Sequence, residues 1–110
     1  MAEAALDSKA EEVVILDLRK LSFSFDYFVL CSATSDRHLQ TVAEGIGGRF
    51  SGNGFRSAHR EGRPEGGWVL LDYGPVVAHV FLPETREFYR LERLWADAPR
   101  LSVPKKKRSQ

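Results

Sequence analysis

The sequence predicts an α/β fold, a single domain in which a mixed sheet of about five strands carries flanking helices. Strand-like apolar segments alternate with helical ones, and Gly74-Pro75 joins two of the strands by a link too short for a helical crossover. Those two strands must be antiparallel neighbours, whereas strands that adjoin helices favour a sheet with helices packed on it. The length of 110 residues allows one domain.

The predicted elements follow from local apolar patterns and turn signals. Good helix formers open the chain, Ser35 is a suitable N-cap for a middle helix with a regular apolar stripe, and Pro83 can be the first residue of the last helix. In chain order we expect a helix over 2–12, strands over 13–18 and 26–31, a helix over 36–50, a short strand over 55–59, strands over 68–73 and 76–82, and a helix over 84–95.

Apolar stripes indicate which sides of these elements are buried. The strand over 26–31 is apolar on both faces and should be covered on both sides. The last helix should bury Phe88, Leu91 and Trp95. Three glycines weaken the middle helix over 45–48, where we expect it to fray or bend. Pro99 should end regular structure, which leaves a domain over 1–100 and a disordered basic tail over 101–110.

The composition is that of a soluble globular protein, with 43% hydrophobic and 28% charged residues. No run approaches the ~20 apolar residues that cross a membrane, and the acidic, polar N-terminus does not resemble a signal peptide. The single Cys31 lies in an apolar run and is expected to be a buried structural thiol. These features favour a cytoplasmic protein.

The charge is unevenly distributed along the chain. Four bases, Lys105 to Arg108, lie in the tail, and without them the formal net charge falls from +1 to −3. Domains that bind nucleic acid normally carry a basic body. The mildly acidic body therefore favours a basic protein partner over a phosphate backbone.

Patterns for phosphate or metal binding are missing. The glycines at 45–48 lie inside a helical pattern and not between a strand and a helix N-terminus, so they do not form a phosphate loop. None of His38, His59 and His79 has a partner Cys or His at ligand spacing. We expect His79 to be a hydrogen-bonded core imidazole and not a catalytic base, and His38 to face solvent.

Evidence for catalysis is equally thin. Ser32 and Ser35 follow a strand, but the Gly-x-Ser-x-Gly elbow is absent and helix capping explains them better. Asp17 and Asp26 sit at neighbouring strand ends and could hold a divalent metal, although solvated strand ends explain them as well. The sequence therefore predicts no catalytic residue, no metal and no cofactor.

Polar groups beside apolar elements suggest where a partner binds. Asp72 is disfavoured inside a strand, so its place at the predicted hairpin needs a cause, and Gly74 suits a backbone conformation that larger residues resist. Tyr89 falls about 100° from the buried line of the last helix and lies near Arg93. We predict a partner-binding surface of Asp72, Tyr73, Gly74, Tyr89 and Arg93; the alternative is that both tyrosines merely flank the core.

Several motifs stand in a fixed order along the chain, among them Asp26-Tyr27-Phe28-Val29, Ser35-Asp36-Arg37-His38, Trp68-Val69-Leu70-Leu71-Asp72-Tyr73-Gly74, Val77-Ala78-His79-Val80-Phe81 and Arg86-Glu87-Phe88-Tyr89. In this order they resemble the Iojap family, the bacterial ribosomal silencing factors, over about residues 3–99. Each motif alone is weak, but their joint order over one short domain is highly specific.

The resemblance implies a sheet with flanking helices, similar to nucleotidyltransferases but without their activity. It also implies a translation repressor that binds the large ribosomal subunit through ribosomal protein L-fourteen and blocks joining of the small subunit. Two departures concern the contact. Pro75 stands where the family usually has Asp, which removes a charge from the hairpin tip, and the Lys105–Arg108 tail lies outside the common core, where it would touch ribosomal RNA or nothing.

Two other classes of function stay open from the residues alone. A nucleotidyltransferase-like enzyme needs a Gly-Ser followed by an Asp-x-Asp pair to hold metal and triphosphate, and the sequence contains neither. A small homodimeric interaction module is the third reading, since the sequence does not fix the oligomeric state.

Overall fold

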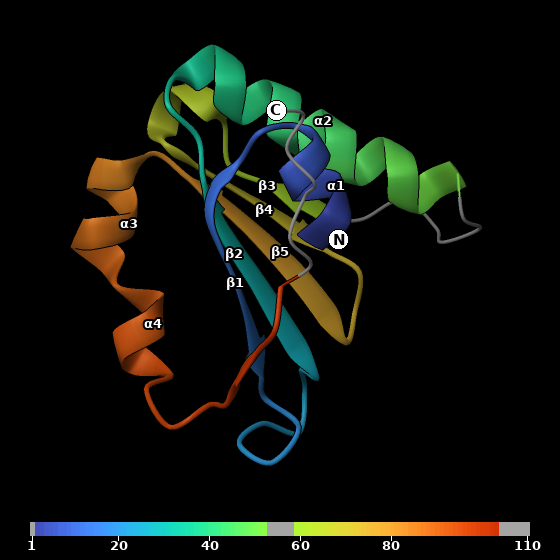
Figure 1. The fold of residues 1–110 in the computed structure, drawn as a ribbon, viewed down its shortest axis with the longest axis vertical. Helices are drawn as coiled ribbons and strands as arrows, with labels where there is room; N and C mark the ends of the chain where they lie inside the picture. Colours follow the sequence, from blue (N-terminus) through green and yellow to red (C-terminus); the bar gives the residue numbers. More distant parts are fainter. Residues whose placement is uncertain (1, 53–58, 104–110) are drawn as a thin grey trace, which may run out of the picture.

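The computed structural model describes residues 2–52 and 59–103, which build one mixed sheet with helices on both faces (Figure 1). In the sheet the strands lie in the order β3-β4-β5-β2-β1-β6. The helical elements are α1 (Ala2–Asp7), α2 (Asp36–Gly52), η1 (Pro64–Gly66), α3 (Pro83–Tyr89) and α4 (Leu91–Leu94). The strands are β1 (Glu11–Asp17), β2 (Tyr27–Ser32), β3 (His59–Glu61), β4 (Trp68–Asp72), β5 (Val76–Phe81) and β6 (Arg100–Leu101).

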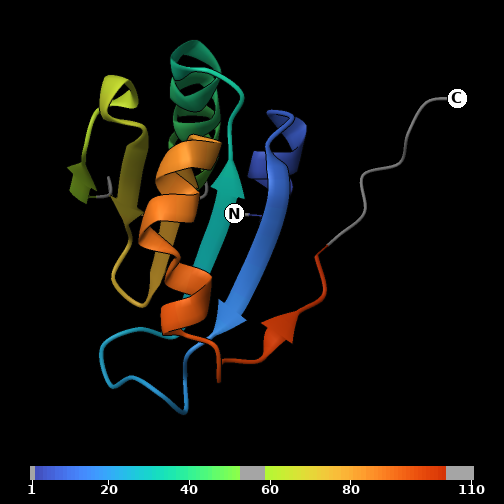
Figure 2. The same ribbon diagram turned by 90° about the vertical axis from the view of Figure 1, so that its left-hand side faces the viewer.

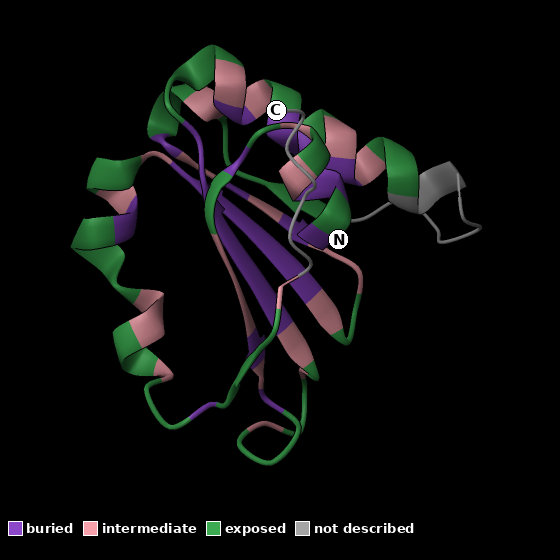
Figure 3. Cartoon of the chain, viewed as in Figure 1, coloured by how far each residue is buried: buried purple, intermediate pink, exposed green. Residues whose placement is uncertain are grey.

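The two central strands, β2 and β5, are the one parallel pair among the described strands, and every other pairing is antiparallel. Five of the six residues of each central strand are buried. Figure 3 shows these two strands largely in the buried colour. The prediction that the second strand is covered on both sides is confirmed, as is the antiparallel pairing of β4 with β5.

Each face of the sheet has its own apolar core. The helices α1 and α2 cover one face, where Leu39, Val42 and Ile46 of α2 pack on Val69 and Val80. On the other face, which α3 and α4 cover in Figure 2, Phe28, Leu30 and Phe81 pack with the half-buried Trp68 and Trp95. Because successive side chains of a strand point to opposite faces of the sheet, neighbouring residues of β4 or β5 belong to different cores.

The middle helix runs through its glycines to Gly52, so the expected fraying over 45–48 is wrong. A Cβ on Gly45 would lie 2.3 Å from Ser8 Oγ, so this glycine lets α1 approach α2 closely. The N-cap prediction is confirmed, because the His38 backbone N–H donates to Ser35 Oγ at 3.1 Å. His38 itself is half-buried: Thr34 N–H donates to its Nδ1, and its Nε2 bonds the Ser8 carbonyl at 2.9 Å, which corrects the solvent-facing expectation.

Other boundaries differ from the predicted ones. The first helix ends at Asp7, and Lys9 then takes a φ of 64° before β1 begins. Pro99 does not end regular structure, since β6 pairs with β1 directly after it and takes in Leu101 of the predicted tail. Of the short strand predicted over 55–59, residues 55–58 lie outside the described part of the chain, while His59 begins β3. Residues 104–110 of the predicted tail also lie outside it.

The predicted last helix is broken in two. Pro83 is its first residue, as expected, but Arg90 takes a left-handed φ of 46° and separates α3 from α4. Because of this break, Phe88 and the pair Leu91 and Trp95 do not share one face of a continuous helix. Leu91 and Trp95 pack on the sheet, whereas Phe88 is 79% exposed, so its predicted burial is wrong. Arg86 is buried instead.

Candidate partner-binding surface

The hairpin between β4 and β5 is a turn that Asp72 holds together. Its Oδ1 accepts a hydrogen bond from the Gly74 backbone N–H at 2.8 Å, and Tyr73 N–H donates to the Val76 carbonyl at 3.0 Å. Gly74 has a φ of +83°, in the left-handed region that favours glycine, as expected. The turn thus explains why Asp72 is tolerated at the end of a strand.

Tyr73 lies on the α2 face of the sheet. The half-buried ring packs against the core beneath α2, and a Cβ on Gly47 of that helix would lie 3.8 Å from its hydroxyl. Burial raises the pKa of this phenol. Tyr73 is therefore partly a packing residue.

Tyr89 lies on the opposite face. Its ring centroid is 4.8 Å from that of Trp68 and 5.0 Å from that of Phe88, and half of its surface is exposed. Trp68 begins β4 and Asp72 ends it, a span of roughly 13 Å at the usual strand rise. The five predicted contact residues thus form two groups: Asp72, Tyr73 and Gly74 at the hairpin, and Tyr89 and Arg93 on the α3–α4 face.

We call Trp68, Leu70, Phe88 and Tyr89 the aromatic surface. Trp68 and Leu70, both half-buried, also line a hollow of about 190 Å³ together with Glu61 and Gly62. A Cβ at Gly62 would lie 2.2 Å from the Trp68 carbonyl oxygen, so this glycine packs tightly against the tryptophan backbone. The aromatic surface therefore combines exposed rings, a shallow recess and an acidic edge.

The buried side chain of His79 holds the Trp68 indole in place. It is 3% exposed, and its Nδ1 accepts the Trp68 indole N–H at 3.2 Å, which places the imidazole proton on Nε2. The ring also packs against Phe28, at 4.7 Å between centroids, and Phe81. Burial lowers the pKa of His79 to about 4. The prediction of a buried, hydrogen-bonded core imidazole is confirmed.

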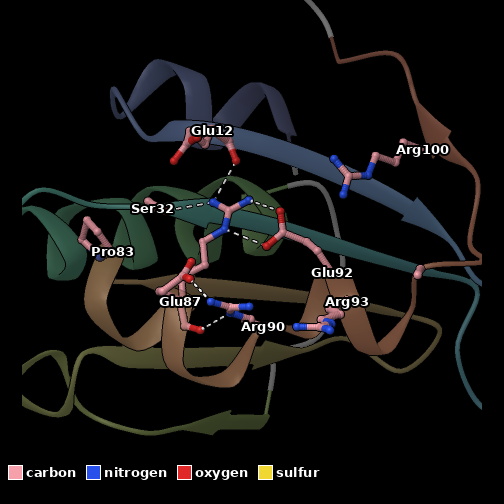
Figure 4. A pocket seen from close by; sticks show the side chains of 10 residues that line it. Glu12, Ser32, Pro83, Glu87, Arg90, Glu92, Arg93 and Arg100 are labelled. Carbon is pink, nitrogen blue, oxygen red and sulfur yellow. Dashed lines mark hydrogen bonds and ion pairs between the residues drawn. The ribbon is translucent and has the colours of Figure 1, made fainter.

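A larger open hollow of about 840 Å³ lies between α3, α4 and β1 (Figure 4). Two of its four arginines pair with acids: Arg86 with Glu92 at 2.8 Å, and Arg90 with Glu87. Arg93 and Arg100 line the same hollow. The hydrogen bonds from Arg86 lower the pKa of Glu92. Arg93, a predicted contact residue four positions after Tyr89, thus borders a charged hollow.

The remaining polar candidates have structural roles. Asp17 pairs with Arg19 at 2.8 Å, and that partner lowers the carboxyl pKa to about 2. Cys31 is fully buried, as expected, and burial raises its thiol pKa to about 12. Over residues 2–52 and 59–103 no three His, Cys, Asp or Glu side chains gather as a metal site, and no helix is long and apolar enough to span a membrane.

Two residues that shape this face have no predicted role in the sequence. The sequence places Trp68 in a strand and nothing more, although tryptophan is enriched among the residues that dominate protein interfaces. Arg86 does not stand out, because a lone arginine among charged neighbours carries no periodic signal. The described residues thus define an α/β protein built on a six-stranded mixed sheet, and among them no His, Cys, Asp or Glu side chains gather as a metal site.

Comparisons with known proteins agree with this class. The family described as "Ribosomal silencing factor during starvation" matches residues 1–110. A ribosomal silencing factor of Bacillus subtilis is 42% identical over 98 residues, which span 89% of this chain and 83% of that protein. A crystal structure of a Chromobacterium violaceum protein superposes with a TM-score of 0.82 at 32% identity and covers 94% of this chain and 86% of that one.

A mouse protein named for mitochondrial assembly of the ribosomal large subunit is 41% identical over 73 residues, which span 64% of this chain and 32% of that protein. The chain belongs to the ribosomal silencing factor family. The resemblance drawn from the motifs is confirmed, and a ribosome-associated role in translation silencing follows from the family.

Proposed function

We propose that this protein is a translation repressor that binds the large ribosomal subunit through ribosomal protein L-fourteen and thereby blocks joining of the small subunit. It acts in the cytoplasm, without catalysis and without a cofactor. Family membership supports the silencing role, and the name of the mouse relative supports the large subunit as the partner. The observation that carries a binding role is the pair Phe88 and Tyr89, two exposed aromatic rings side by side on α3.

The aromatic surface is the primary contact in this proposal. Aromatic side chains dominate the energetics of protein interfaces, and exposing them to water without a partner is unfavourable. The recess has an apolar floor of Trp68 and Leu70 and one acid, Glu61, at its edge. A body charge of −3 suits a basic ribosomal protein.

The hairpin residues Asp72, Tyr73 and Gly74 form a second contact in the proposal, and Arg93 extends the first. Because the two groups lie on different faces and at opposite ends of β4, one flat partner surface does not cover both. The partner has to wrap around the edge strand β3, or the hairpin touches a neighbouring component of the subunit. The Lys105–Arg108 tail adds at most a minor contact with ribosomal RNA.

Co-sedimentation with isolated large subunits tests this function. We expect the wild-type chain to pellet with large subunits and to reduce the yield of whole ribosomes when small subunits are added afterwards. Large subunits that lack L-fourteen should not retain the chain. Binding to small subunits alone would contradict the proposal, as would turnover of a nucleotide with magnesium. Sedimentation of the free chain at twice its monomer mass would favour the homodimeric module.

A further inference from the structure

We infer that Arg86 is a positioning residue for the aromatic surface: it anchors α3 to the sheet and fixes the angle between α3 and α4. The inference rests on the proposed function, because it concerns how the partner contact is held in place. It assigns Arg86 no contact with the partner.

The anchor of α3 is polar. Arg86 is the one buried residue among the seven of this helix, while Phe88 is 79% exposed and Tyr89, whose ring contacts Trp68, is half exposed. A helix on a sheet is ordinarily held by an apolar stripe. In α3 no apolar residue is buried, and the Arg86 guanidinium instead joins the helix to β1 and β2 by hydrogen bonds.

Four hydrogen bonds join this guanidinium to three separate elements. Nη1 donates to the Glu12 carbonyl of β1 at 2.9 Å and to Ser32 Oγ at the end of β2 at 2.8 Å. Nε and Nη2 donate to the two carboxylate oxygens of Glu92 in α4, at 3.0 and 2.8 Å. The planar guanidinium of arginine carries enough N–H donors to bind a carboxylate through two hydrogen bonds and to donate to two further acceptors at once.

The Glu12 carbonyl is a special acceptor. The register of β1 against β2 shifts between Glu11 and Val14, and Glu12, inside the shift, has a φ of 48°. Bulges of this kind redirect groups that a regular ladder would pair. Arg86 thus binds a point of β1 that the strand pairing leaves available.

The pair with Glu92 spans the break between the helices. Arg90, the single residue between α3 and α4, is both the C-cap of the first and the N-cap of the second. The left-handed backbone conformation of Arg90 is unfavourable for a residue other than glycine. The angle between α3 and α4 therefore needs support from side-chain contacts. The side chains of Arg86 and Glu92 are 10% and 24% exposed, which limits screening of the pair by salt.

Loss of this pair should lower affinity without removing any contact. Tyr89 immediately precedes the break, and its ring meets Trp68 only while α3 keeps its present orientation. If the helices sample other orientations, the apparent affinity falls in proportion to the binding-competent fraction. A competent fraction of about one tenth would weaken binding about tenfold.

Two matched variants test the inference. Glu92→Gln breaks the buried pair, and Glu87→Gln breaks the exposed pair of the same hollow with the same change in charge. We expect Glu92→Gln to bind large subunits about tenfold more weakly and to show faster hydrogen exchange over 83–95 in the free chain, with the strands unchanged. Glu87→Gln should bind within about twofold of wild type. Arg86→Lys, which keeps the charge but loses the fork, should resemble Glu92→Gln.

Three results would overturn the inference. Wild-type affinity in Glu92→Gln would show that the pair does not position the surface. Equally accelerated exchange in all strands would show that Arg86 serves global stability alone. Unchanged exchange over 83–95 would show that the helices need no anchor, and this readout holds even if the wild-type chain fails to bind large subunits, a result that would sink the proposed function separately.

Discussion

The indole N–H of Trp68 donates to Nδ1 of His79 across neighbouring strands, at 3.2 Å. Because Tyr89 lies on the same indole, this hydrogen bond connects a buried core residue to the proposed contact surface. If Trp68 belongs to the contact, His79 should influence binding only through the orientation of Trp68, and substitution of His79 should mainly change the free energy of unfolding.

Acid should weaken the fold through His79. Its pKa is 6.5 in the unfolded chain and about 4 in the folded one, so between these values the unfolded state binds the extra proton. The contribution is fully present above pH 6.5 and is lost as the pH falls to 4, by about 3 kcal/mol. Denaturant unfolding of wild type and His79→Asn over this window checks it: the variant should show a flatter pH dependence. Parallel curves would contradict a neutral buried imidazole.

Two glycines should respond to alanine in opposite directions. Gly74 has space for a Cβ but a φ of +83°, so Gly74→Ala should cost about 1–2 kcal/mol of unfolding free energy. Gly48 lies within α2 and has open space where a Cβ would stand, so Gly48→Ala should stabilise by about 0.5–1 kcal/mol. Thermal melts of both variants measure the difference, and equal shifts would show that the turn does not constrain Gly74.

Salt should weaken large-subunit binding only slightly. The body of the chain carries −3, and the proposed contact is aromatic and acidic. About six phosphate contacts would give a log–log slope of about −5, and we expect a far shallower one, shallower still without residues 104–110. Affinity titrations at several salt concentrations provide the slope. A steep dependence that survives the deletion would identify RNA phosphates as the main partner.

The sequence predicts the sheet well because apolar patterning and turn chemistry are local. The strands around Gly74, the N-cap at Ser35 and the buried Cys31 all lie where their neighbours dictate. The α3–α4 face could not be predicted in this way. A helical period counted through Arg90 assigns Phe88, Leu91 and Trp95 to one buried stripe, but the left-handed Arg90 ends that period, and Phe88 is exposed while Leu91 and Trp95 pack on the sheet.

The division of the predicted site into two groups has the same origin. Tyr73 and Tyr89 look equivalent in sequence, yet strand alternation and the helix break place them on opposite faces. The strand β6 also lacks a local signal, because two residues after a proline pair with β1 only once the chain has returned to that edge.

Tyr73→Ala should mainly affect stability. Its half-buried ring packs under α2, so truncation should lower the unfolding free energy by roughly 1–3 kcal/mol. Binding of the folded fraction to large subunits should fall less than in Tyr89→Ala. Chemical denaturation combined with binding at low temperature separates the two effects, and an unchanged stability with abolished binding would instead make Tyr73 the primary contact.

The affinity of Tyr89→Ala for isolated large subunits is the decisive measurement for the aromatic surface. Tyr89 is half exposed, and its ring contacts are with Trp68 and the exposed Phe88. Because it fills no buried core position, its truncation should leave the melting temperature nearly unchanged. We predict binding weaker by about 1–3 kcal/mol, roughly a five- to 150-fold rise in Kd. Wild-type affinity in a folded Tyr89→Ala chain would contradict the proposed contact and place it elsewhere on the molecule.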